Sequence, residues 1–476
     1  MSGSAAVSLG EPTTRYPLGP NMAVVITGTT GQPQPAWECR VQATTKSGGW
    51  REVTDDDGAA QAFVDVLRHT VTVPAEGFRV VRLVPPPEAT GERPVEAKRP
   101  ERPDRSVVVG ERVVVTWVHR LGDREHPAPL TLAHLAERRF LGVPVTHGML
   151  TWQSPNGREL PCAVATGYLP RSRDGWAWCP DLVEQKLGLR RSGGLADTAG
   201  LGRLIGPLTG PLPVADSWID DFPARIGRLA AKLHVALATP SSLLPEPVQE
   251  VGPERLRSWH EAAAARVQRV VDLTRTGALD DGEHVLLPRV TALRAAVDGL
   301  SALADTFGPG DGVVVQRIHG DLHAGQFVRW PGGLAVVDFD ADPALAGDEL
   351  TSLDDPITQP AARDVAQLLL SLDHVGRVID ARHGFRSTES VDAWSTAARA
   401  QLLDAYRAEL EHADLGSLFD ERLLPAFEAE QVCREILWAT RHRPEWLHAS
   451  LAGLRLMTPP EDGYPGPSGR HRAPDA

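Results

Sequence analysis

The chain has 476 residues, of which 42% are hydrophobic and 23% charged, the composition of a folded globular protein long enough for about two or three domains. Its formal net charge of −13 argues against nucleic acid or an anionic membrane as the main partner. No apolar run approaches the roughly 20 residues that a membrane helix needs. The start MSGSAAVSLGEPTTRY has neither the basic end nor the apolar centre of a signal peptide.

The spacing of the cysteines indicates the cellular compartment of the protein. They are scattered along the chain without C-x-x-C spacing, which favours reduced thiols in a cytosolic protein over a disulfide framework or a zinc site. The four are Cys39, Cys162, Cys179 and Cys433. We therefore expect a cytoplasmic protein. A monomer is expected as well.

The N-terminal region, residues 21–100, is expected to form a small α+β unit with its linker. Residues 1–20 are small, polar and proline-bearing, which predicts disorder. One helix is predicted from apolar residues at helical spacing, among them Ala59, Phe63 and Leu67. Strands are expected at 23–27, 37–45, 50–54 and 78–84.

A second region is expected from residue 101 to residue 170. The residues that precede and open it, 85–104, are rich in proline and charge, which is typical of a linker or an exposed loop. The run SVVVGERVVVTWV then predicts two strands joined by a turn at Gly110 and Glu111. CAVATGYLP, which ends at Pro170, predicts a further strand followed by a hinge.

Helices are expected to dominate residues 171–457. Apolar stripes predict helices near 226–237, 255–273, 290–307 and 362–375. His234 lies in the first stripe and is expected to be structural. Three segments are expected outside the packed core: a surface excursion at 192–213, a solvated acidic face at 347–355 and a disordered tail at 458–476.

The densest group of reactive side chains lies in RIHGDLHAGQFVRWPGGLAVVDFDADP, residues 317–343. Apolar runs of valine, leucine and alanine precede Asp321 and Asp338, and such runs bounded by Gly and Pro are typical of buried strands. Each aspartate is therefore expected on a loop just past a strand. A solvated loop with scattered acids is the alternative.

These residues suit phosphoryl transfer. That reaction needs a carboxylate to orient and deprotonate the attacking hydroxyl, and oxygen ligands that hold Mg²⁺ across the nucleotide phosphates. Asp321 fits the base. Gln326 and Asp338 offer the oxygen ligands, with Asp340 as a possible further one. The predicted cofactors are ATP and Mg²⁺.

A second candidate site lies on EAEQVCREILWATRHRPEW, residues 428–446, which is predicted to form one helix ended by Pro444. Its residues at spacings of four, three and four share one face. They are Gln431, Glu435, Trp438 and His442. An aromatic plane beside amide and carboxylate groups suits a sugar, whereas an amphipathic helix with one buried tryptophan is the alternative.

The stretch H-G-D-L-H-A-G-Q from His319 to Gln326, followed by D-F at Asp338, resembles the aminoglycoside-phosphotransferase-like kinases and, within them, the maltokinase-like branch. The resemblance covers roughly residues 100–455 and is strong in the two C-terminal motifs and weak before them. It implies an α+β, bilobal, protein-kinase-like fold with an N-terminal cap and a mainly helical C-lobe. The loop of residues 319–326, which carries Asp321, is called the catalytic loop. His319 and His323 are expected to support it, and Asp364 of R-D-V-A to brace it.

The resemblance also locates the nucleotide. Adenine is expected at the hinge, Thr166, Gly167, Tyr168 and Leu169. The family's phosphate-binding lysine falls at Thr116 in this chain and its partner glutamate at Leu130, so both are missing. Substitutes for the lysine are Arg105, His119 or Arg120.

The run Q-V-C-R-E with the following aromatic, R-H, P and W resembles the signature of glucosamine kinases in the maltokinase-like group. It implies ATP-dependent phosphorylation of glucosamine at its 6-hydroxyl, with the helix residues and Asp321 contacting the sugar. The expected partners are these small substrates, without nucleic acid or membrane. A maltokinase, an aminoglycoside phosphotransferase and a non-catalytic ATP-binding protein are the alternatives.

Overall fold

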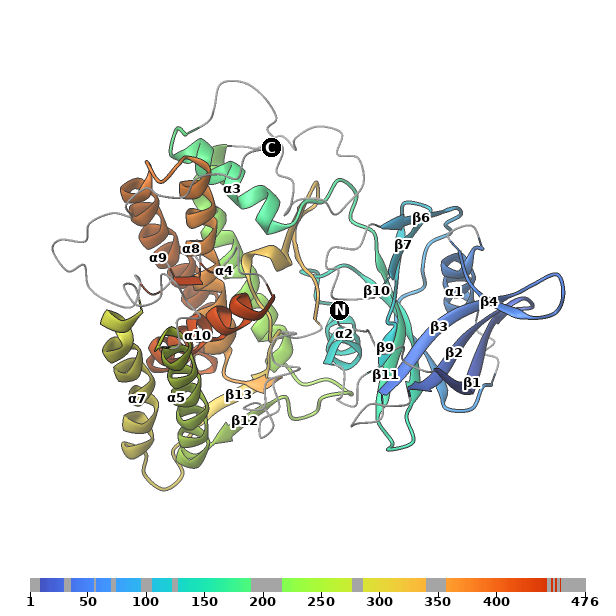
Figure 1. The fold of residues 1–476 in the computed structure, drawn as a ribbon, viewed down its shortest axis with the longest axis horizontal. Coiled ribbons are helices and arrows are strands. Elements are labelled where there is room, and N and C mark those ends of the chain that lie inside the picture. The colour runs from blue at the N-terminus through green and yellow to red at the C-terminus, as the bar shows by residue number, and fades with distance from the viewer. Residues whose placement is uncertain are drawn as a thin grey trace. The chain divides into compact units, whose positions relative to one another are not determined.

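The computed structural model of the chain describes residues 9–29, 36–54, 57–69, 74–95, 105–121, 127–189, 216–275, 286–339, 357–442, 447, 450, 451 and 454. Predictions that fall elsewhere lie outside the described residues. These are the excursion at 192–213, the acidic segment 347–355, the tail 458–476, Asp340 and Pro444. By the density of internal contacts the chain divides into two units. The first contains residues 1–250, 314–347 and 354–419, and the second contains 251–313, 348–353 and 420–476. Figure 1 shows the helices and strands, coloured by residue number.

The first unit begins with an antiparallel sheet of five strands within the described residues, in the order β1-β2-β3-β4 with β9 beside β3. The strands are β1 Leu9–Gly19, β2 Met22–Thr29, β3 Ala36–Thr44, β4 Trp50–Glu52 and β9 Arg120–Leu121. The prediction of disorder up to residue 20 is therefore wrong for β1. Its backbone pairs with β2, and its alternating Tyr16 and Leu18 are buried, so this segment has both hydrogen-bond partners and a core face.

A second antiparallel sheet has the order β5-β10-β11-β8-β7-β6 in the described residues. Its strands are β5 Phe78–Arg82, β6 Glu92–Val95, β7 Arg105–Val109, β8 Val113–Trp117, β10 Thr146–Gln153 and β11 Glu159–Gly167. The predicted boundary at residue 100 falls inside this sheet. The linker prediction for 85–104 is wrong at β6, where Pro94 is tolerated because the strand lies at the sheet edge.

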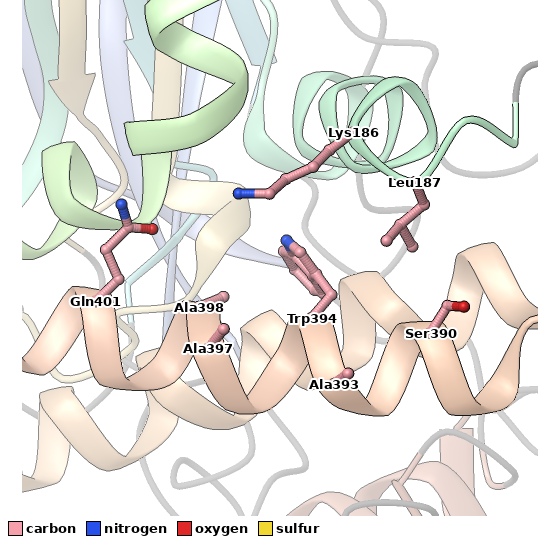
Figure 2. A pocket seen from close by; sticks show the side chains of 8 residues that line it. All are labelled: Lys186, Leu187, Ser390, Ala393, Trp394, Ala397, Ala398 and Gln401. Atoms are coloured by element: carbon pink, nitrogen blue, oxygen red, sulfur yellow. The ribbon is translucent and has the colours of Figure 1, made fainter.

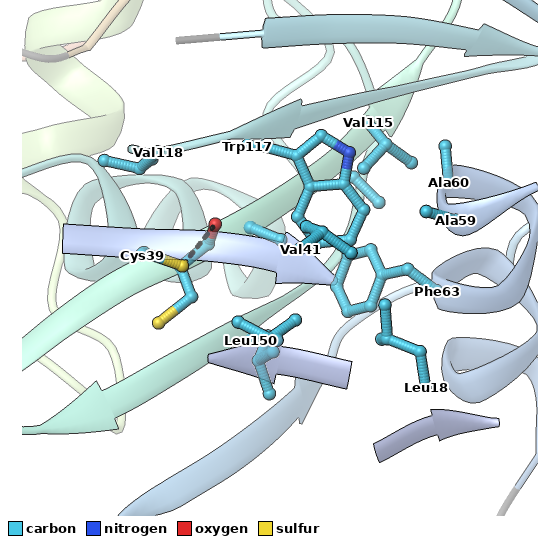
Figure 3. Packing of buried hydrophobic residues seen from close by; sticks show 14 of the residues in the cluster. Leu18, Cys39, Val41, Ala59, Ala60, Phe63, Val115, Trp117, Val118 and Leu150 are labelled. Carbon is cyan, nitrogen blue, oxygen red and sulfur yellow. Dashed lines mark hydrogen bonds between the residues drawn. The ribbon is translucent and has the colours of Figure 1, made fainter. Parts of the chain in front are cut away.

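One hydrophobic core joins these two sheets with helix α1, Ala59–Arg68 (Figure 3). Phe63 of α1 packs against Trp117 of β8 with ring centroids 5.7 Å apart. Val113, Val115 and Trp117 are all buried in this core, because alternate residues of a strand face the same side. Val114 and Thr116 therefore face the opposite side of the second sheet.

The rest of the first unit is mainly helical. Helices α4, Asp216–Ala238, and α9, Thr388–His412, pack along each other, and α8, Ala361–Arg382, packs against α9. Helices α2, Pro127–Glu137, and α3, Gly175–Lys186, complete the helices described in this unit. Among the described residues, no helix combines the length and the apolar character required to cross a membrane.

The second unit is built from α5, Pro253–Arg275, α7, Val290–Asp305, and α10, Leu424–His442. The three predicted helices of this unit are thus present. α10 packs on both of the others, with Phe427 against Trp259 and the buried carboxylate of Glu430 bonded to the guanidinium of Arg266. α10 is buried on more than one side, because Val432, Ile436 and Ala439, which lie around the helix from Phe427 and Glu430, are also buried.

Candidate active site

Two short sheets aim the predicted catalytic residues. The first has the order β12-β13-β16, with β12 at Val248–Val251, β13 at Val313–Arg317 and β16 at Thr358–Gln359. β16 leads within two residues into α8. β14, Phe327–Trp330, pairs with β15, Gly333–Val336. Asp321 therefore follows β13, and Asp338 follows β15, as the apolar runs predicted.

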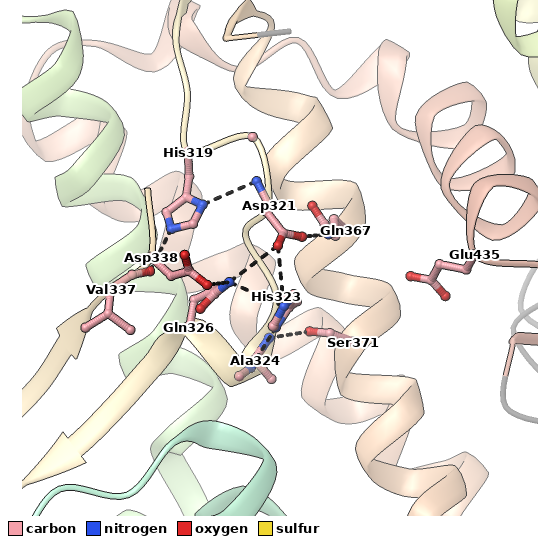
Figure 4. A network of polar contacts seen from close by, with 12 residues as sticks. His319, Asp321, His323, Ala324, Gln326, Val337, Asp338, Gln367, Ser371 and Glu435 are labelled. Atoms are coloured by element: carbon pink, nitrogen blue, oxygen red, sulfur yellow. Dashed lines mark hydrogen bonds and ion pairs between the residues drawn. The ribbon is translucent and has the colours of Figure 1, made fainter. Parts of the chain in front are cut away.

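The carboxylate of Asp321 is buried in a polar network (Figure 4), with the residue only 6% exposed. Its Oδ1 accepts a hydrogen bond of 2.7 Å from Nε2 of Gln367 on α8. Its Oδ2 lies 3.5 Å from Nε2 of Gln326 and 3.9 Å from Nε2 of His323, longer than an ordinary hydrogen bond. The two oxygens thus have different surroundings.

Gln326 lies between two carboxylates, and this arrangement fits a cation. Its Nε2 is 3.4 Å from Oδ2 of Asp338 and 3.5 Å from Oδ2 of Asp321, so an amide donor occupies a place where positive charge is favoured. Carboxylate and amide oxygens are the ligands that Mg²⁺ takes in proteins. The described residues contain no cluster of three or more His, Cys, Asp or Glu with metal-site geometry. Asp340 lies outside them.

Asp338 adopts a left-handed backbone conformation, with φ 67°. Such a conformation is uncommon for a residue with a Cβ, although aspartate tolerates it better than most. It turns the chain sharply after β15, which directs the Asp338 side chain back toward Gln326. Residues in such conformations concentrate at functional sites, because the surrounding structure must offset the strain.

His319 is a neutral hydrogen-bonding hub of the loop. Its Nε2 lies 3.0 Å from the carbonyl of Val337, and its Nδ1 accepts from the N–H of Asp321 at 3.3 Å. This pattern places the ring proton on Nε2. Burial lowers the pKa of His319, which agrees with a neutral ring. His319 therefore joins the loop after β13 to the loop after β15.

His323 packs against a side chain of α3. Its Nδ1 accepts from the N–H of Gly325 at 3.0 Å, and its ring packs against Trp176 with centroids 5.4 Å apart. The backbones approach so closely here that a Cβ on Gly175 would lie 1.8 Å from the carbonyl oxygen of Ala324. Glycine is therefore required at the start of α3.

Asp364 bonds to the backbone of the catalytic loop, the contact expected of a bracing residue. Its Oδ2 accepts from the N–H of His319 at 2.8 Å and its Oδ1 from the N–H of Gly320 at 2.9 Å. Behind it, Nε2 of His234 lies 3.0 Å from Oδ2, and Nδ1 of His234 lies 2.6 Å from the hydroxyl of Tyr406.

His234 was predicted to be a structural residue, but its link to the catalytic loop through Asp364 was not predicted. Burial raises the pKa of Tyr406 well above its usual range, so its hydroxyl keeps a proton to donate to His234. Gln367 and Ser371 were also missed. The signal available was their spacing: polar residues at 364, 367 and 371 lie on one face of the helix.

The residues proposed to replace the family's phosphate-binding lysine do not lie together. Thr116 bonds to Ser106 across the hairpin, Oγ1 to Oγ at 2.9 Å, on the face away from the core. Arg105 pairs with Trp117 and by alternation shares the core-facing side. His119 Nδ1 lies 3.1 Å from the carbonyl of Cys39, and Arg120 pairs with Glu38, so both lie beside β3 of the N-terminal sheet.

The hinge residues end β11. Thr166 and Gly167 are its last residues, followed by Tyr168 and Leu169. The N–H of Gly167 donates to the carbonyl of Val145 at 2.7 Å, and that of Tyr168 donates to the carbonyl of Arg112 at 2.8 Å. These two donors are therefore already engaged within the protein.

The predicted sugar-binding face lies on α10, which begins four residues earlier than the predicted helix. Gln431 donates from Nε2 to Oε1 of Glu435 at 3.0 Å. Trp438 and His442 follow, with ring centroids 5.7 Å apart. Gln431 is buried, Glu435 and Trp438 are half-buried, and His442 is exposed, so the face opens toward the end of the helix.

A shallow pocket elsewhere in the first unit has a different character (Figure 2). It has a volume of about 300 Å³ and lies between the end of α3 and one side of α9. Trp394 and Ala398 form part of its wall, and Lys186, whose Nζ is 3.4 Å from Asp220 Oδ1, lies at its edge. It has no carboxylate lining it, and we assign it no catalytic role.

Known proteins match nearly the whole length of the chain, although no family model matches it. A glucosamine kinase of Streptacidiphilus jiangxiensis is 32% identical over 420 residues, 87% of this chain and 84% of that protein. A glucosamine kinase of Mycolicibacterium smegmatis is 30% identical over 443 residues, covering 93% and 97%.

A solved structure, a glucosamine kinase in complex with glucosamine, ADP and inorganic phosphate, superposes with a TM-score of 0.74 at 28% identity over 96% of each chain. The α+β, kinase-like fold predicted from the sequence is thereby confirmed. The coverage and identity of these relatives show that the chain belongs to the glucosamine kinase family.

Proposed function

We propose that this protein is an ATP-dependent kinase that phosphorylates glucosamine on its 6-hydroxyl. The observation that carries the proposal is the network around Asp321: a buried carboxylate with one oxygen held by Gln367 and the other facing Gln326 and His323. Such a carboxylate can orient a sugar hydroxyl and accept its proton as the bond to phosphorus forms. Membership of the glucosamine kinase family supports the choice of acceptor.

Magnesium is held by Gln326 and Asp338 in this proposal, with Asp340 as a further ligand. When bound, the ion neutralises the charge of the nucleotide phosphates. His319 keeps these residues in register with the base, because it bonds both to the N–H of Asp321 and to the carbonyl that precedes Asp338. Asp364 and His323 fix the same loop from α8 and from the side of α3.

Adenine is proposed to bind along Thr166 to Leu169. Because the N–H groups of Gly167 and Tyr168 are engaged, the contacts fall to the other main-chain groups of this segment. For the phosphates, the hydroxyls of Thr116 and Ser106 lie on the sheet face away from the core, and the register disfavours Arg105. Because these hydroxyl donors are neutral, the metal ion is left to neutralise the charge of the phosphates.

Glucosamine is proposed to contact the α10 face. The carboxylate of Glu435 would pair with the sugar ammonium, Gln431 and His442 would bond to hydroxyls, and Trp438 would stack on the ring. The Gln431 bond to Glu435 supports this, because it fixes one carboxylate oxygen. The protein is proposed to be cytoplasmic and monomeric, and its four buried free thiols suit a reducing compartment.

The test is turnover by the purified protein with ATP and magnesium against glucosamine, N-acetylglucosamine, glucose and maltose. Glucosamine should have the highest kcat/KM, and N-acetylglucosamine should be rejected because acetylation removes the charge and adds bulk. Maltose as the best substrate would indicate a maltokinase. Nucleotide binding without turnover of any sugar would indicate a non-catalytic protein, and resistance conferred on a sensitive host an aminoglycoside kinase.

A further inference from the structure

One face of α8 holds the catalytic loop at three points. Asp364, Gln367 and Ser371 follow each other at spacings of three and four, so their side chains lie on the same side of the helix. All three are buried. Asp364 accepts from two backbone N–H groups of the loop, and Ser371 Oγ accepts from the N–H of Ala324 at 2.9 Å. These two residues position the main chain.

Gln367 makes a different contact, because it reaches the side chain of Asp321. The donor is identified by chemistry: an ionised carboxylate only accepts, so the amide NH₂ of Gln367 must face it. At 2.7 Å the bond from Nε2 to Oδ1 is at the short end of the usual range. It fixes the rotation of the carboxylate about its own axis, which leaves Oδ2 on the side of Gln326 and His323.

We propose that Gln367 is a positioning residue for the base. It holds Asp321 so that Oδ2 meets the hydroxyl of the acceptor, and it stabilises the charged form of the carboxylate without adding a positive charge. This inference rests on the proposed function, in which Asp321 accepts the proton. A lysine or arginine in this place would hold the carboxylate too, but its charge would make Asp321 a weaker base.

Several groups surround Asp321. His323 faces Oδ2 at 3.9 Å, and Asp338 lies beyond the neutral amide of Gln326. His319 accepts from the backbone N–H of Asp321, and Asp364 of α8 bonds to the backbone of the preceding residues. Gln367 is distinguished from all of these by its short bond to the carboxylate, so its removal should lower kcat without a matching change in KM for ATP.

The experiment compares kcat and KM of wild type, Gln367→Met and Gln367→Glu. Methionine keeps the length of the side chain and removes the donor. We expect kcat with glucosamine to fall about 10- to 150-fold, the usual loss for a hydrogen bond to a charged group, with KM for ATP within about threefold. Glutamate removes the donor and places a second carboxylate against Asp321, so kcat should fall at least as far.

The matched control is Gln359→Met. Gln359 is also buried in the first unit, and its Oε1 accepts from Nε of Arg363 at 2.9 Å. This variant should lose stability while keeping the kcat and the KM for ATP of wild type. Equal kcat in wild type and Gln367→Met would overturn the inference while leaving the proposed function intact.

Failure of the proposed function itself would be visible in wild type, as absence of glucosamine turnover. Gln367→Glu carries the test if Gln367→Met does not fold, because it retains the size and polarity of glutamine. A kcat equal to that of wild type in Gln367→Glu would equally overturn the inference.

Discussion

Helices α8 and α10 both carry polar side chains on one face, but these faces differ in burial. On α8, Asp364, Gln367 and Ser371 are all buried, and each is bonded to the catalytic loop. On α10, burial decreases from Gln431 to the exposed His442, and Gln431 bonds to Glu435 of the same helix. The same helical spacing of polar residues therefore serves different roles in α8 and α10. A fully buried polar face positions other protein groups, whereas a face that opens to solvent is suited to a ligand.

The largest expected effect tests the group that α8 positions. Asp321→Asn keeps the shape of the side chain but removes the proton acceptor, so kcat should fall by about 10²- to 10⁴-fold. Nucleotide binding should be retained and the melting temperature should change little. Steady-state kinetics and ATP titration measure both. Asp298→Asn, an exposed substitution in the second unit, is the control, and near-normal turnover by Asp321→Asn would refute the base assignment.

The next effect tests whether α10 reads the sugar. A bond between Glu435 and the glucosamine ammonium would be charge-assisted, and its loss should cost about 1.5–3 kcal/mol, or roughly 10- to 150-fold in kcat/KM. Glu435→Gln should therefore lose glucosamine activity and narrow the gap to glucose. Glu409→Gln on α9, which loses an ion pair with Lys232, is the control and should leave the ratio unchanged. An unchanged ratio in Glu435→Gln would mean that this carboxylate does not contact the amine.

A smaller effect should separate positioning from recognition. Ser371→Ala leaves the buried N–H of Ala324 without its acceptor, which should lower the free energy of unfolding by about 1–3 kcal/mol. The preference for glucosamine over glucose should not change. Ser395→Ala is the matched control, because that buried hydroxyl has no hydrogen-bond partner among the described residues. Urea unfolding measures both, and an altered sugar preference in Ser371→Ala would contradict the division of tasks.

The smallest effect concerns the place of the missing lysine. The hydroxyl of Thr116 is hydrogen-bonded to that of Ser106 and carries no charge. Thr116→Ala should therefore change KM for ATP by no more than about threefold, the low end of the range for one neutral hydrogen bond. A loss above tenfold would show that Thr116 itself makes an essential phosphate contact. Ser106→Ala provides the paired variant.

The catalytic loop was predictable because its signal is local. Apolar runs locate β13 and β15, and Asp321 and Asp338 follow them within a few residues. The bond from Gln367 to Asp321 joins residues 46 positions apart, so no short window of sequence contains it. The roles of the site residues stay predictions.

Strands were harder to predict than helices, because strand pairing also depends on residues that are far apart in the sequence. β1 and β6 look like disordered or linker sequence by composition, and each becomes a strand because a neighbour offers its backbone. The helices α4, α5, α7 and α8 carry their own apolar stripes and were located from them. Their packing partners were not predictable, which is why the link from Tyr406 through His234 to Asp364 was missed.

The shared core of α1, β3 and β8 has a consequence for anyone who wishes to shorten this protein. Cutting the gene near residue 100, where the composition suggests a seam, would strip β5 and β6 from their sheet and expose Val113, Val115 and Trp117 to water. Such a fragment should aggregate on expression. For the same reason, hybrids between this enzyme and its relatives should exchange the first 167 residues as one cassette, ending with β11.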